Sequence, residues 1–270
     1  MARFSGKTAV ITGSGRAAGL GAAIALRLAQ EGAAVVLSDR AAEPGSAAAL
    51  EIAGIADTIR AAGGAASVCP CDVTAWDAVQ ALADHARRAH GSLDIWVNNA
   101  GIGFIMKPLL ELGPDDWNQV IDVNLTGAFH GLRIAAAAMV AQGTGGRIIN
   151  VASQAAKSGF PHAQAYCASK HGLVGLVRSA AIDLGPHAIT VNNVCPNHVT
   201  TGLGAWQNDY FAARAGVSVE RYLADMAARI PLGRPGLTSD TANAVAFLCS
   251  DEAAYITAES LNVSGGEEPH

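Results

Sequence analysis

The chain alternates between short apolar runs and longer segments in which apolar residues recur at helical spacing. Most of the apolar runs are rich in Val and Ile and end at a glycine or a polar residue, which is typical of buried parallel strands. We expect strands at residues 8–11, 34–38, 66–68, 93–97, 146–151, 190–195 and 260–263.

The segments between these runs have the periodicity of helices that bury one face. We expect helices at residues 22–31, within 43–64, and at 75–89, 115–141, 163–184 and 239–249. Strands that alternate with helices in this way predict a parallel sheet with right-handed crossovers. The expected fold class is therefore α/β, with residues 1–270 forming a single domain. Its sheet is expected to be Rossmann-like and doubly wound, with about seven strands and helices on both faces.

Residues 202–230 break the alternation of strands and helices. They contain four aromatic residues: Trp206, Tyr210, Phe211 and Tyr222. A segment of this length after the sixth strand favours a helical lid that supplies part of a substrate pocket. The alternative is an ordinary helical excursion that packs on the core.

Composition and charge narrow the class of protein. The chain has 270 residues, 50% of them hydrophobic and 15% charged, which is enough for one large core. A formal net charge of −5 without clusters of Lys and Arg argues against a nucleic-acid or anionic-membrane partner. No apolar run approaches the ~18 residues of a membrane span, and residues 1–7 lack a signal-peptide core. We expect a cytoplasmic protein whose partner is a small-molecule substrate.

The cysteines favour the same compartment. There are five of them, an odd number, and they are scattered along the chain, which indicates reduced thiols. Cys69-Pro70-Cys71 could be read as a metal or redox pair. It lacks a second ligand pair and the C-x-x-C spacing, so we expect no metal site.

A glycine-rich turn follows the first expected strand and leads into a helix. Gly13, Gly15, Gly19 and Gly21 lie in this turn, together with Arg16. Glycines let a backbone approach a pyrophosphate, and a helix N-terminus supplies free N–H groups and a positive dipole end. The order of strand, turn and helix is the context that a dinucleotide fingerprint requires, although such a turn can also serve only to reverse the chain.

The second expected strand ends in Asp39, 18 residues beyond Gly21. An acidic residue about 20 residues after the fingerprint accepts hydrogen bonds from the adenosine ribose. Its charge would repel a 2′-phosphate, so Asp39 favours NAD over NADP. Arg16 and Arg40 act against this preference, and an aspartate at a strand end can also be a simple helix cap.

The stretch from Ser153 to Lys170 carries the clearest chemistry. Tyr166 lies thirteen residues after Ser153, and Lys170 follows Tyr166 at i+4. On a helix, the phenol and the amine would share one face. An ammonium about 4 Å from the phenol, at an effective dielectric of ~20, favours the phenolate by roughly 4 kcal/mol. That would bring the pKa of Tyr166 close to physiological pH and suit it to proton transfer with a substrate oxygen.

Asn124 lies in the middle of the long helix expected at residues 115–141. Asparagine is a poor interior residue for a helix because its amide competes for backbone partners. Its presence there favours either a local kink near Gly127 or a carbonyl that is freed to hold a water molecule.

Together these residues resemble the short-chain dehydrogenase/reductase superfamily over nearly the whole chain. The resemblance rests on the following matches: Thr12-Gly13, Gly19-Leu20-Gly21, Asp72-Val73, Asn98-Asn99-Ala100-Gly101, Asn124, Ser153, Tyr166-Cys167-Ala168-Ser169-Lys170, Leu232-Gly233-Arg234-Pro235 and Val245-Ala246-Phe247-Leu248.

The resemblance implies a role for each of the matched positions. Tyr166 would be the acid/base, Lys170 would lower its pKa and hold the nicotinamide ribose, Ser153 would orient the substrate oxygen, and Asn124 would hold a relay water. Asp72 and Val73 would lie at the adenine, Asn98 near the adenosine ribose, and Val199 with Thr201 at the carboxamide. The expected cofactor-binding set is Gly13, Gly15, Arg16, Gly19, Leu20, Asp39, Asp72, Val73, Asn98, Gly101, Tyr166, Lys170, Val199 and Thr201.

The chain departs from the family pattern at three places. Five residues instead of three separate Gly13 from Gly19, which leaves open the question of which glycine turns the chain. Pro196 is followed by Asn197, where the family commonly has glycine, so that the asparagine could face the substrate. The stretch from Asp39 to Asp72 is longer than usual.

The expected function is hydride transfer between NAD and a secondary alcohol or its ketone, with the cofactor carrying the redox chemistry. Gln154, Asn197 and His198 are polar and favour a polyol, sugar or vicinal diol, although both His162 and His198 can be read as structural. The expected substrate-contacting set is Ser153, Gln154, Tyr166, Asn197, His198 and Trp206.

Two alternatives remain at this stage. One is a 3-oxoacyl-type carbonyl reductase, which fits poorly with Asp39. The other is a non-catalytic dinucleotide sensor, which would be expected to lack Tyr166 or Lys170. The resemblance also implies a homodimer or homotetramer in which the helices at 115–141 and 163–184 pair between subunits. Residues 267–270 are expected to fray or to reach a neighbouring subunit.

Overall fold

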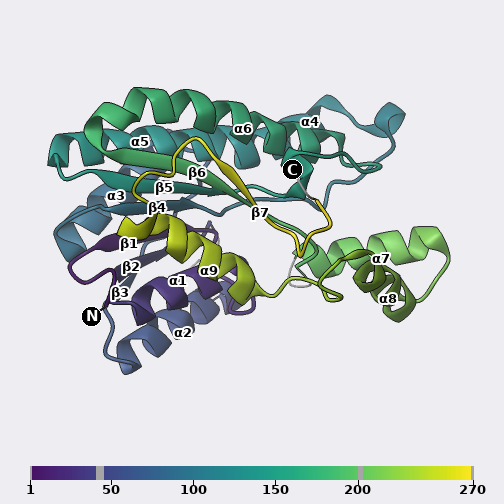
Figure 1. Ribbon diagram of the computed structural model, residues 1–270, viewed down its shortest axis with the longest axis horizontal. Helices are drawn as coiled ribbons and strands as arrows, with labels where there is room; N and C mark the ends of the chain where they lie inside the picture. Colours follow the sequence, from purple (N-terminus) through teal and green to yellow (C-terminus); the bar gives the residue numbers. More distant parts are fainter. Residues whose placement is uncertain (1, 41–45, 200–202, 269–270) are drawn as a thin grey trace.

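Seven parallel strands form the centre of the molecule, in the order β3-β2-β1-β4-β5-β6-β7 (Figure 1). The computed structural model describes residues 2–40, 46–199 and 203–268. The strands are β1 Thr8–Thr12, β2 Ala34–Ser38, β3 Ala66–Val68, β4 Ile95–Asn98, β5 Gly146–Val151, β6 Ile189–Pro196 and β7 Ser260–Val263. The expected parallel, doubly wound sheet is confirmed, and each expected strand is present within about two residues of its expected bounds.

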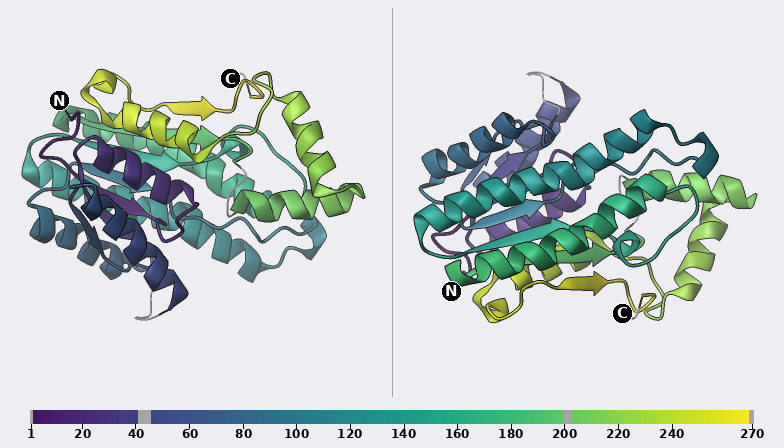
Figure 2. Two further views of the ribbon diagram at one scale, coloured as in Figure 1. Left: turned by 90° about the horizontal axis from the view of Figure 1, so that it is seen from below. Right: turned by 90° about the horizontal axis from the view of Figure 1, so that it is seen from above.

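Helices cover both faces of the sheet, as expected (Figures 1 and 2). One face carries α1 Leu20–Gln30, α2 Ala47–Ala61 and α9 Thr238–Cys249, whereas the other carries α3 Trp76–His90, α5 Gly127–Gln142 and α6 Gln164–Leu184. Among the described residues, no helix is both long and apolar enough to cross a bilayer.

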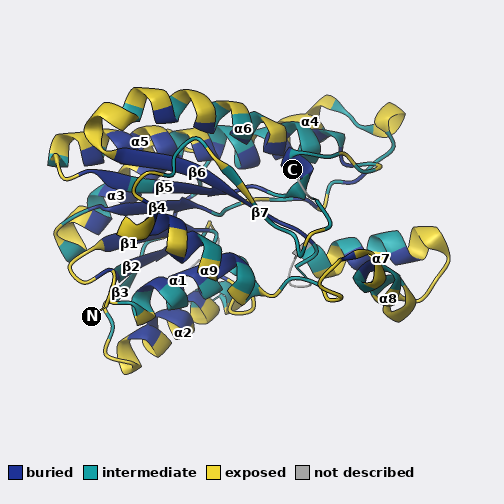
Figure 3. Ribbon diagram, viewed as in Figure 1, coloured by how far each residue is buried: buried dark blue, intermediate teal, exposed yellow. Residues whose placement is uncertain are grey.

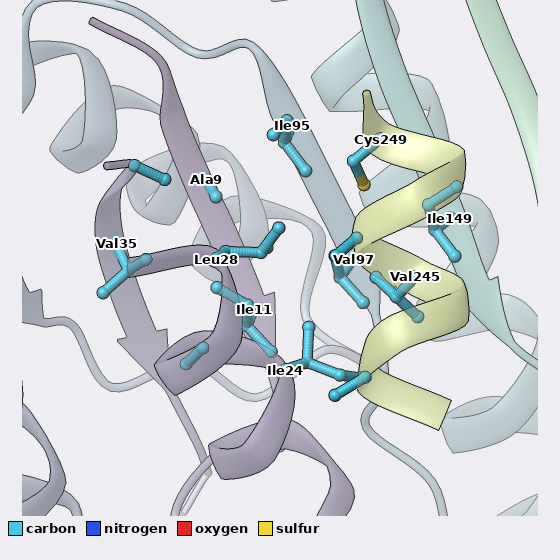
Figure 4. Close-up of a cluster of buried hydrophobic side chains, with 14 of the residues drawn as sticks. Ala9, Ile11, Ile24, Leu28, Val35, Ile95, Val97, Ile149, Val245 and Cys249 are labelled. Carbon is cyan, nitrogen blue, oxygen red and sulfur yellow. The ribbon is translucent and has the colours of Figure 1, made fainter. Parts of the chain in front are cut away.

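Burial on both faces explains why the strands read as continuous apolar runs. All five residues of β1 are buried, and the strands are dark throughout most of their length in Figure 3. On the face of α1 and α9, Ile24 and Val245 pack towards Ile11 and Val97 of the central strands (Figure 4). Such strands need apolar residues at successive positions, because both sides of the pleat meet a helix.

The strand order reverses between β1 and β4, and the loops that follow these two strands meet there. The Asn99 amide donates to the carbonyl oxygens of Thr12 and Gly13, at 2.9 and 2.8 Å. In doubly wound sheets, ligands bind in the crevice at this switch point, beyond the carboxyl ends of the strands. The sheet therefore presents a binding edge where the glycine-rich turn lies.

The long helix expected at residues 115–141 is interrupted. It consists of α4 Pro114–Ile121, a π-helical turn Asp122–Thr126, and α5. Asn124 lies in the π-helical turn, and its amide binds both backbone groups of Ile102, at 2.8 Å each. The side chain therefore draws the helix out of its regular pattern, as the asparagine in the sequence had indicated.

Two helices stand apart from the sheet at its carboxyl-end edge (Figures 1 and 2). They are α7 Leu203–Ala215 and α8 Val219–Arg229, which occupy most of the expected lid segment at residues 202–230. The Ser218 hydroxyl caps α8 by accepting a hydrogen bond from the backbone N–H of Arg221, at 3.2 Å. The helical form of this segment agrees with the expectation, and its action as a lid stays a prediction.

Candidate active site

Gly13 turns the chain after β1. Its φ is +64°, a conformation that favours glycine, and a Cβ at this position would lie 2.6 Å from the Cα of Ala100. The close approach of the two loops therefore requires a glycine here. Gly13 is therefore the glycine that turns the chain, since Gly15 and Gly19 have negative φ.

Gly15 makes room for Asp39. The backbone N–H of Gly15 donates to Asp39 Oδ2 at 2.9 Å, and a Cβ on Gly15 would lie 2.8 Å from that oxygen. The other carboxylate oxygen accepts from the backbone N–H of Arg40, at 2.8 Å. The sequence therefore brings an acidic side chain from the end of β2 directly onto the glycine-rich turn.

The N-terminus of α1 is suited to an anion. Gly19 is its N-cap and Leu20 its first residue; no described side chain caps the helix, and its first turn has no acidic residue. Backbone N–H groups and the positive end of the helix dipole therefore meet the turn, where Arg16 is exposed. A dinucleotide fits this arrangement, because its pyrophosphate would lie at these N–H groups and a ribose hydroxyl could donate to Asp39.

Ser153, Tyr166 and Lys170 converge at the carboxyl end of β5. Ser153 follows this strand, and its hydroxyl hydrogen-bonds the Tyr166 hydroxyl. Tyr166 and Lys170 lie one turn apart on α6, and Lys170 Nζ lies 5.7 Å from the centre of the phenol ring. The same ammonium donates to the carbonyl oxygen of Val151, at 2.9 Å.

Burial acts on both titrating groups of this set. It raises the pKa of Tyr166, against the effect of the Ser153 hydrogen bond. It lowers the pKa of Lys170, which is 5% exposed, to about 8. The expected lowering of the phenol's pKa by the ammonium is therefore not found, because burial of Tyr166 disfavours its charged form.

Asn124 is fixed beside this set. Besides its two bonds to Ile102, its amide donates to the hydroxyl of Ser169, at 3.2 Å. A Cβ on Gly101 would lie 3.3 Å from Asn124 Oδ1 and 3.8 Å from Lys170 Nζ, so these three residues adjoin. The side-chain amide of Asn124 is already hydrogen-bonded to protein groups. We therefore predict that its main-chain carbonyl holds the relay water.

The Asn98 side chain is held inside the fold, and the place of this residue near the adenosine ribose stays a prediction. Asn98 is 6% exposed, and its amide binds the indole N–H of Trp96, the carbonyl of Ala128 and the side chain of Asn150. It points into the interior between β4, β5 and α5, and all three contacts hold it there. The Asn98 side chain thus connects β4, β5 and α5, whereas its neighbour Asn99 holds the glycine-rich turn.

Asp72, Val73 and Val199, three more of the expected cofactor residues, lie at the same edge of the sheet. Asp72 follows β3 and accepts from the backbone and hydroxyl of Thr74, at 2.9 and 2.8 Å. The Val73 carbonyl hydrogen-bonds His130, at 3.0 Å. Val199 forms a parallel β-bridge with Gly236. Thr201 lies outside the described residues.

Three of the polar residues expected to contact substrate bind the C-terminal segment, and their contact with substrate stays a prediction. Asn197 Nδ2 donates to Glu267 Oε2 at 2.6 Å, and His198 Nε2 lies 2.9 Å from the same oxygen. Gln154 Nε2 donates to Glu268 Oε1, at 2.5 Å. Residues 267 and 268 therefore fold back onto their own chain, in contrast to the fraying expected for residues 267–270. Residues 269 and 270 lie outside the described residues.

Aromatic side chains join Tyr166 to the helical segment. The Phe160 ring lies 6.2 Å from the Tyr166 ring and 6.1 Å from that of Phe211 on α7. Tyr210 continues the row at 5.4 Å from Phe211, and it stacks on Trp206 at 5.6 Å. Trp206, expected as a substrate contact, is thus linked through rings to the proton-transfer candidate.

Sequence reasoning did not single out four residues that hold this site. Ile102 and Ser169 position Asn124, Glu267 engages Asn197 and His198, and Phe160 bridges Tyr166 and α7. Only Ser169 had a signal, its place in the Tyr-x-x-x-Lys segment. The others act through contacts between distant parts of the chain, which the residue pattern does not encode.

Comparison with known proteins supports the family and the fold. A family model described as "Enoyl-(Acyl carrier protein) reductase" matches residues 13–268. A 3beta-hydroxysteroid dehydrogenase 1 of Eggerthella lenta is 39% identical over 266 residues, covering 97% of this chain and 94% of the relative. A sorbitol dehydrogenase of Cereibacter sphaeroides is 35% identical over 268 residues and covers 98% of both chains.

Solved structures agree with these relatives. A carveol dehydrogenase from Mycobacterium avium in complex with NAD superposes with a TM-score of 0.92 at 32% identity and covers 100% of both chains. A variant of actinorhodin polyketide ketoreductase with NADPH has a TM-score of 0.90 at 35% identity, covering 98% of both chains. The chain belongs to the short-chain dehydrogenase/reductase superfamily, and it is an oxidoreductase of the type that uses a nicotinamide dinucleotide.

Proposed function

We propose that this protein is an NAD-dependent oxidoreductase that transfers hydride between a secondary alcohol, or its ketone, and NAD. The observation that carries the proposal is the meeting of Ser153, Tyr166 and Lys170 at the edge of the sheet where the glycine-rich turn and Asp39 also lie. When bound, the nicotinamide accepts or returns the hydride. The protein's own groups have to move the proton.

Tyr166 is the group we assign to that proton. In the oxidative direction its phenolate takes the hydroxyl proton of the alcohol, and in the reductive direction the phenol protonates the developing alkoxide. The Ser153 hydroxyl orients the substrate oxygen against Tyr166, to which it is already hydrogen-bonded. Lys170 provides positive charge beside the phenol ring, which favours the phenolate in the working complex.

Asp39 supports NAD as the cofactor. Its carboxylate lies on the turn that would hold the adenosine ribose, where it accepts hydrogen bonds and repels a 2′-phosphate. The carveol dehydrogenase and polyketide ketoreductase structures contain NAD and NADPH respectively, so the family resemblance alone leaves the choice open. The charge of the Asp39 side chain is the basis for proposing NAD and not NADP.

The substrate class has two kinds of support. Gln154, Asn197 and His198 favoured a polyol, sugar or vicinal diol, and a sorbitol dehydrogenase is among the relatives. The hydroxysteroid and carveol dehydrogenases, by their names, act on alcohols carried by rings. A 3-oxoacyl-type carbonyl reductase is a second candidate, favoured by the similarity to the polyketide ketoreductase.

We propose a reducing compartment such as the cytoplasm as the place of action. All five cysteines are free, and three of them (Cys71, Cys195 and Cys249) are buried. Burial raises the pKa of Cys71 and of Cys249 to about 12, so these thiols stay protonated and unreactive.

The test is turnover by the wild-type protein and by Tyr166→Phe, followed by NADH absorbance over a panel of secondary alcohols. We expect the wild type to oxidise members of the panel, and the variant to lose at least about 1,000-fold in kcat while it still binds NAD. If both proteins bind NAD and neither oxidises any alcohol nor reduces any ketone, the sensor alternative is correct.

A further inference from the structure

We propose that the substrate is a ring-shaped secondary alcohol, such as a substituted cyclohexanol, or its ketone, and that its apolar ring packs on the aromatic row formed by Phe160, Tyr210, Phe211 and Trp206. The inference rests on the proposed function, because it assigns the substrate class of the same site. It replaces the polyol favoured by the sequence.

The aromatic row begins at the reactive group. Phe160 is a ring neighbour of Tyr166, tilted by 55° at 6.2 Å, and Phe211 meets Phe160 edge-on at 6.1 Å. A substrate held at Tyr166 therefore lies next to the first ring of the row, that of Phe160. Aromatic side chains present large apolar surfaces with little conformational entropy to lose, which suits them to hold a ring.

Contacts outside the rings hold the row in place. His162 Nδ1 and the Tyr210 hydroxyl lie 2.6 Å apart, in a hydrogen bond that ties α7 to the segment just before Tyr166. Gln207 Nε2 donates to the carbonyl of Gly103 at 3.4 Å, which ties the same helix to the loop after β4. Behind Phe211, Tyr222 of α8 stacks at 6.4 Å.

The polar residues that a polyol would need are already hydrogen-bonded to the C-terminal segment. Asn197 is 6% exposed, and its amide nitrogen donates a hydrogen bond to Glu267. His198 binds the same carboxylate, and the Gln154 amide nitrogen is given to Glu268. Charge-assisted hydrogen bonds of this kind are among the stronger ones in proteins, so a polyol could use these nitrogens as donors only by breaking them.

The two substrate classes therefore differ in the free energy of binding that the site can provide. A ring buries apolar surface against the aromatic row and needs a single polar contact, at Ser153 and Tyr166. A polyol would bring several hydroxyls out of water to face phenyl rings, and each hydroxyl without a partner opposes binding. The row thus selects rings over chains of hydroxyls.

The first experiment compares kcat/KM of the wild type with saturating NAD for cyclohexanol, 2-butanol and sorbitol. We expect cyclohexanol to exceed 2-butanol by about tenfold and sorbitol by about 100-fold. A kcat/KM for sorbitol equal to or above that for cyclohexanol would overturn the inference while leaving the proposed function intact.

The second experiment uses Phe211→Ala, with Phe247→Ala on α9 as the matched control, since α9 packs on the sheet face opposite to that of α6 and Phe247 is 37% exposed. We expect Phe211→Ala to lower the ratio of the cyclohexanol and 2-butanol kcat/KM values by about tenfold, and Phe247→Ala to leave this ratio within about twofold. An unchanged ratio in Phe211→Ala would count against the aromatic row, because a merely structural loss would lower both values together.

Binding separates this inference from the proposed function. If no alcohol is oxidised, the proposed function fails, and calorimetry of the complex with NADH still decides the substrate class. Tighter binding of cyclohexanone than of sorbitol would support the aromatic row. Tighter binding of sorbitol, or no binding of cyclohexanone, would refute it.

Discussion

Lys170 shows how a single residue can serve function at the expense of stability. It lies in the interior, 5% exposed, with the carbonyl of Val151 as its hydrogen-bond acceptor. Burial lowers its pKa from 10.5 to about 8, and such a lowering corresponds to at most about 3 kcal/mol of unfavourable free energy at neutral pH. The folded protein thus tolerates a costly cation beside the phenol.

We expect Lys170→Met to raise the free energy of unfolding at pH 7 by about 1 to 3 kcal/mol. The unfolded chain keeps the amine protonated up to about pH 10.5, whereas the folded chain releases the proton near pH 8. The penalty is therefore complete below pH 8 and disappears as the pH rises towards 10.5, so the gain should shrink over that range. Urea denaturation at about pH 7 and at about pH 10 measures it.

The same variant should lose most of its turnover, since the phenolate of Tyr166 loses its neighbouring charge. Arg178→Met, a change at an exposed residue of the same helix, serves as the control and should change neither stability nor turnover appreciably. A variant Lys170→Met that is less stable than the wild type at neutral pH would contradict the account.

Asp39 carries the prediction about cofactor choice. We expect Asp39→Ala to lower the ratio of the kcat/KM values for NAD and NADP by about ten- to 100-fold, because the carboxylate no longer repels a 2′-phosphate and Arg40 is exposed beside it. Steady-state kinetics with both cofactors at equal concentration measures the ratio. A wild-type protein that itself prefers NADP tenfold would show that Asp39 had been misread.

The i, i+4 spacing in the sequence was enough to predict that Tyr166 and Lys170 share one helix face. The direction of Asn98 was beyond it, because the side chain follows partners from three other positions: Trp96, Ala128 and Asn150. The opposing effect of burial on Tyr166 and Lys170 was hidden for the same reason. A sequence shows which groups are neighbours along a helix, but not how far those groups are shielded from water.

Among the elements, the segment after β7 links three parts of the site. Glu267 accepts from Asn197 at 2.6 Å, lies 2.9 Å from His198 Nε2, and meets Arg229 at the end of α8 at 3.4 Å. Arg229 is 55% exposed, so its bridge to Glu267 is weaker than the bond to the buried Asn197. The C-terminal segment thereby fastens the loop after β6 to the helical segment.

We expect Glu267→Gln to loosen this connection, with a loss of about 1 to 2 kcal/mol in the free energy of unfolding and faster amide exchange in α8. Hydrogen-exchange mass spectrometry measures the second effect. Glu220→Gln, an exposed change in the first turn of the same helix, is the matched control and should leave the exchange rates unchanged. Equal exchange in α8 of wild type and Glu267→Gln would contradict the connection.

Most elements could be read from the sequence because propensity and burial agree in them. The strand β2 has its expected bounds, since its apolar run meets a helix on each face. The helix expected at 115–141 failed at Asn124, because Ile102, more than twenty residues away, offers its backbone to the amide. The asparagine indicated an irregularity here, but its π-helical form depends on a tertiary partner, which no local pattern reveals.

For the whole molecule, we propose that subunits associate through α5 and α6, as the family resemblance implies. Phe129 is 43% exposed and Ile182 76% exposed on these helices. Gly172 is needed within the subunit, since a Cβ there would lie 2.7 Å from Leu125, whereas Gly175 faces open space. A small residue on an open helix face lets another helix approach closely.

We expect Gly175→Trp to shift the protein from an oligomer to a monomer, as measured by light scattering during size-exclusion chromatography. Gly54→Trp on α2 is the matched control, because this helical glycine also faces open space and lies on the opposite layer. It should keep the wild-type mass. Equal masses for wild type and Gly175→Trp would place the association elsewhere.

The π-helical turn at Asp122–Thr126 has a last consequence, for the evolution of chain length. One residue in an α-helix corresponds to about 100° of rotation, so deleting a single residue here would swing α4 about its axis relative to α5. Gly127 and Gly131 already abut Val73 and Asn98, which leaves α5 no freedom to compensate. Insertions and deletions should accordingly be confined to the loops on either side of this helix pair.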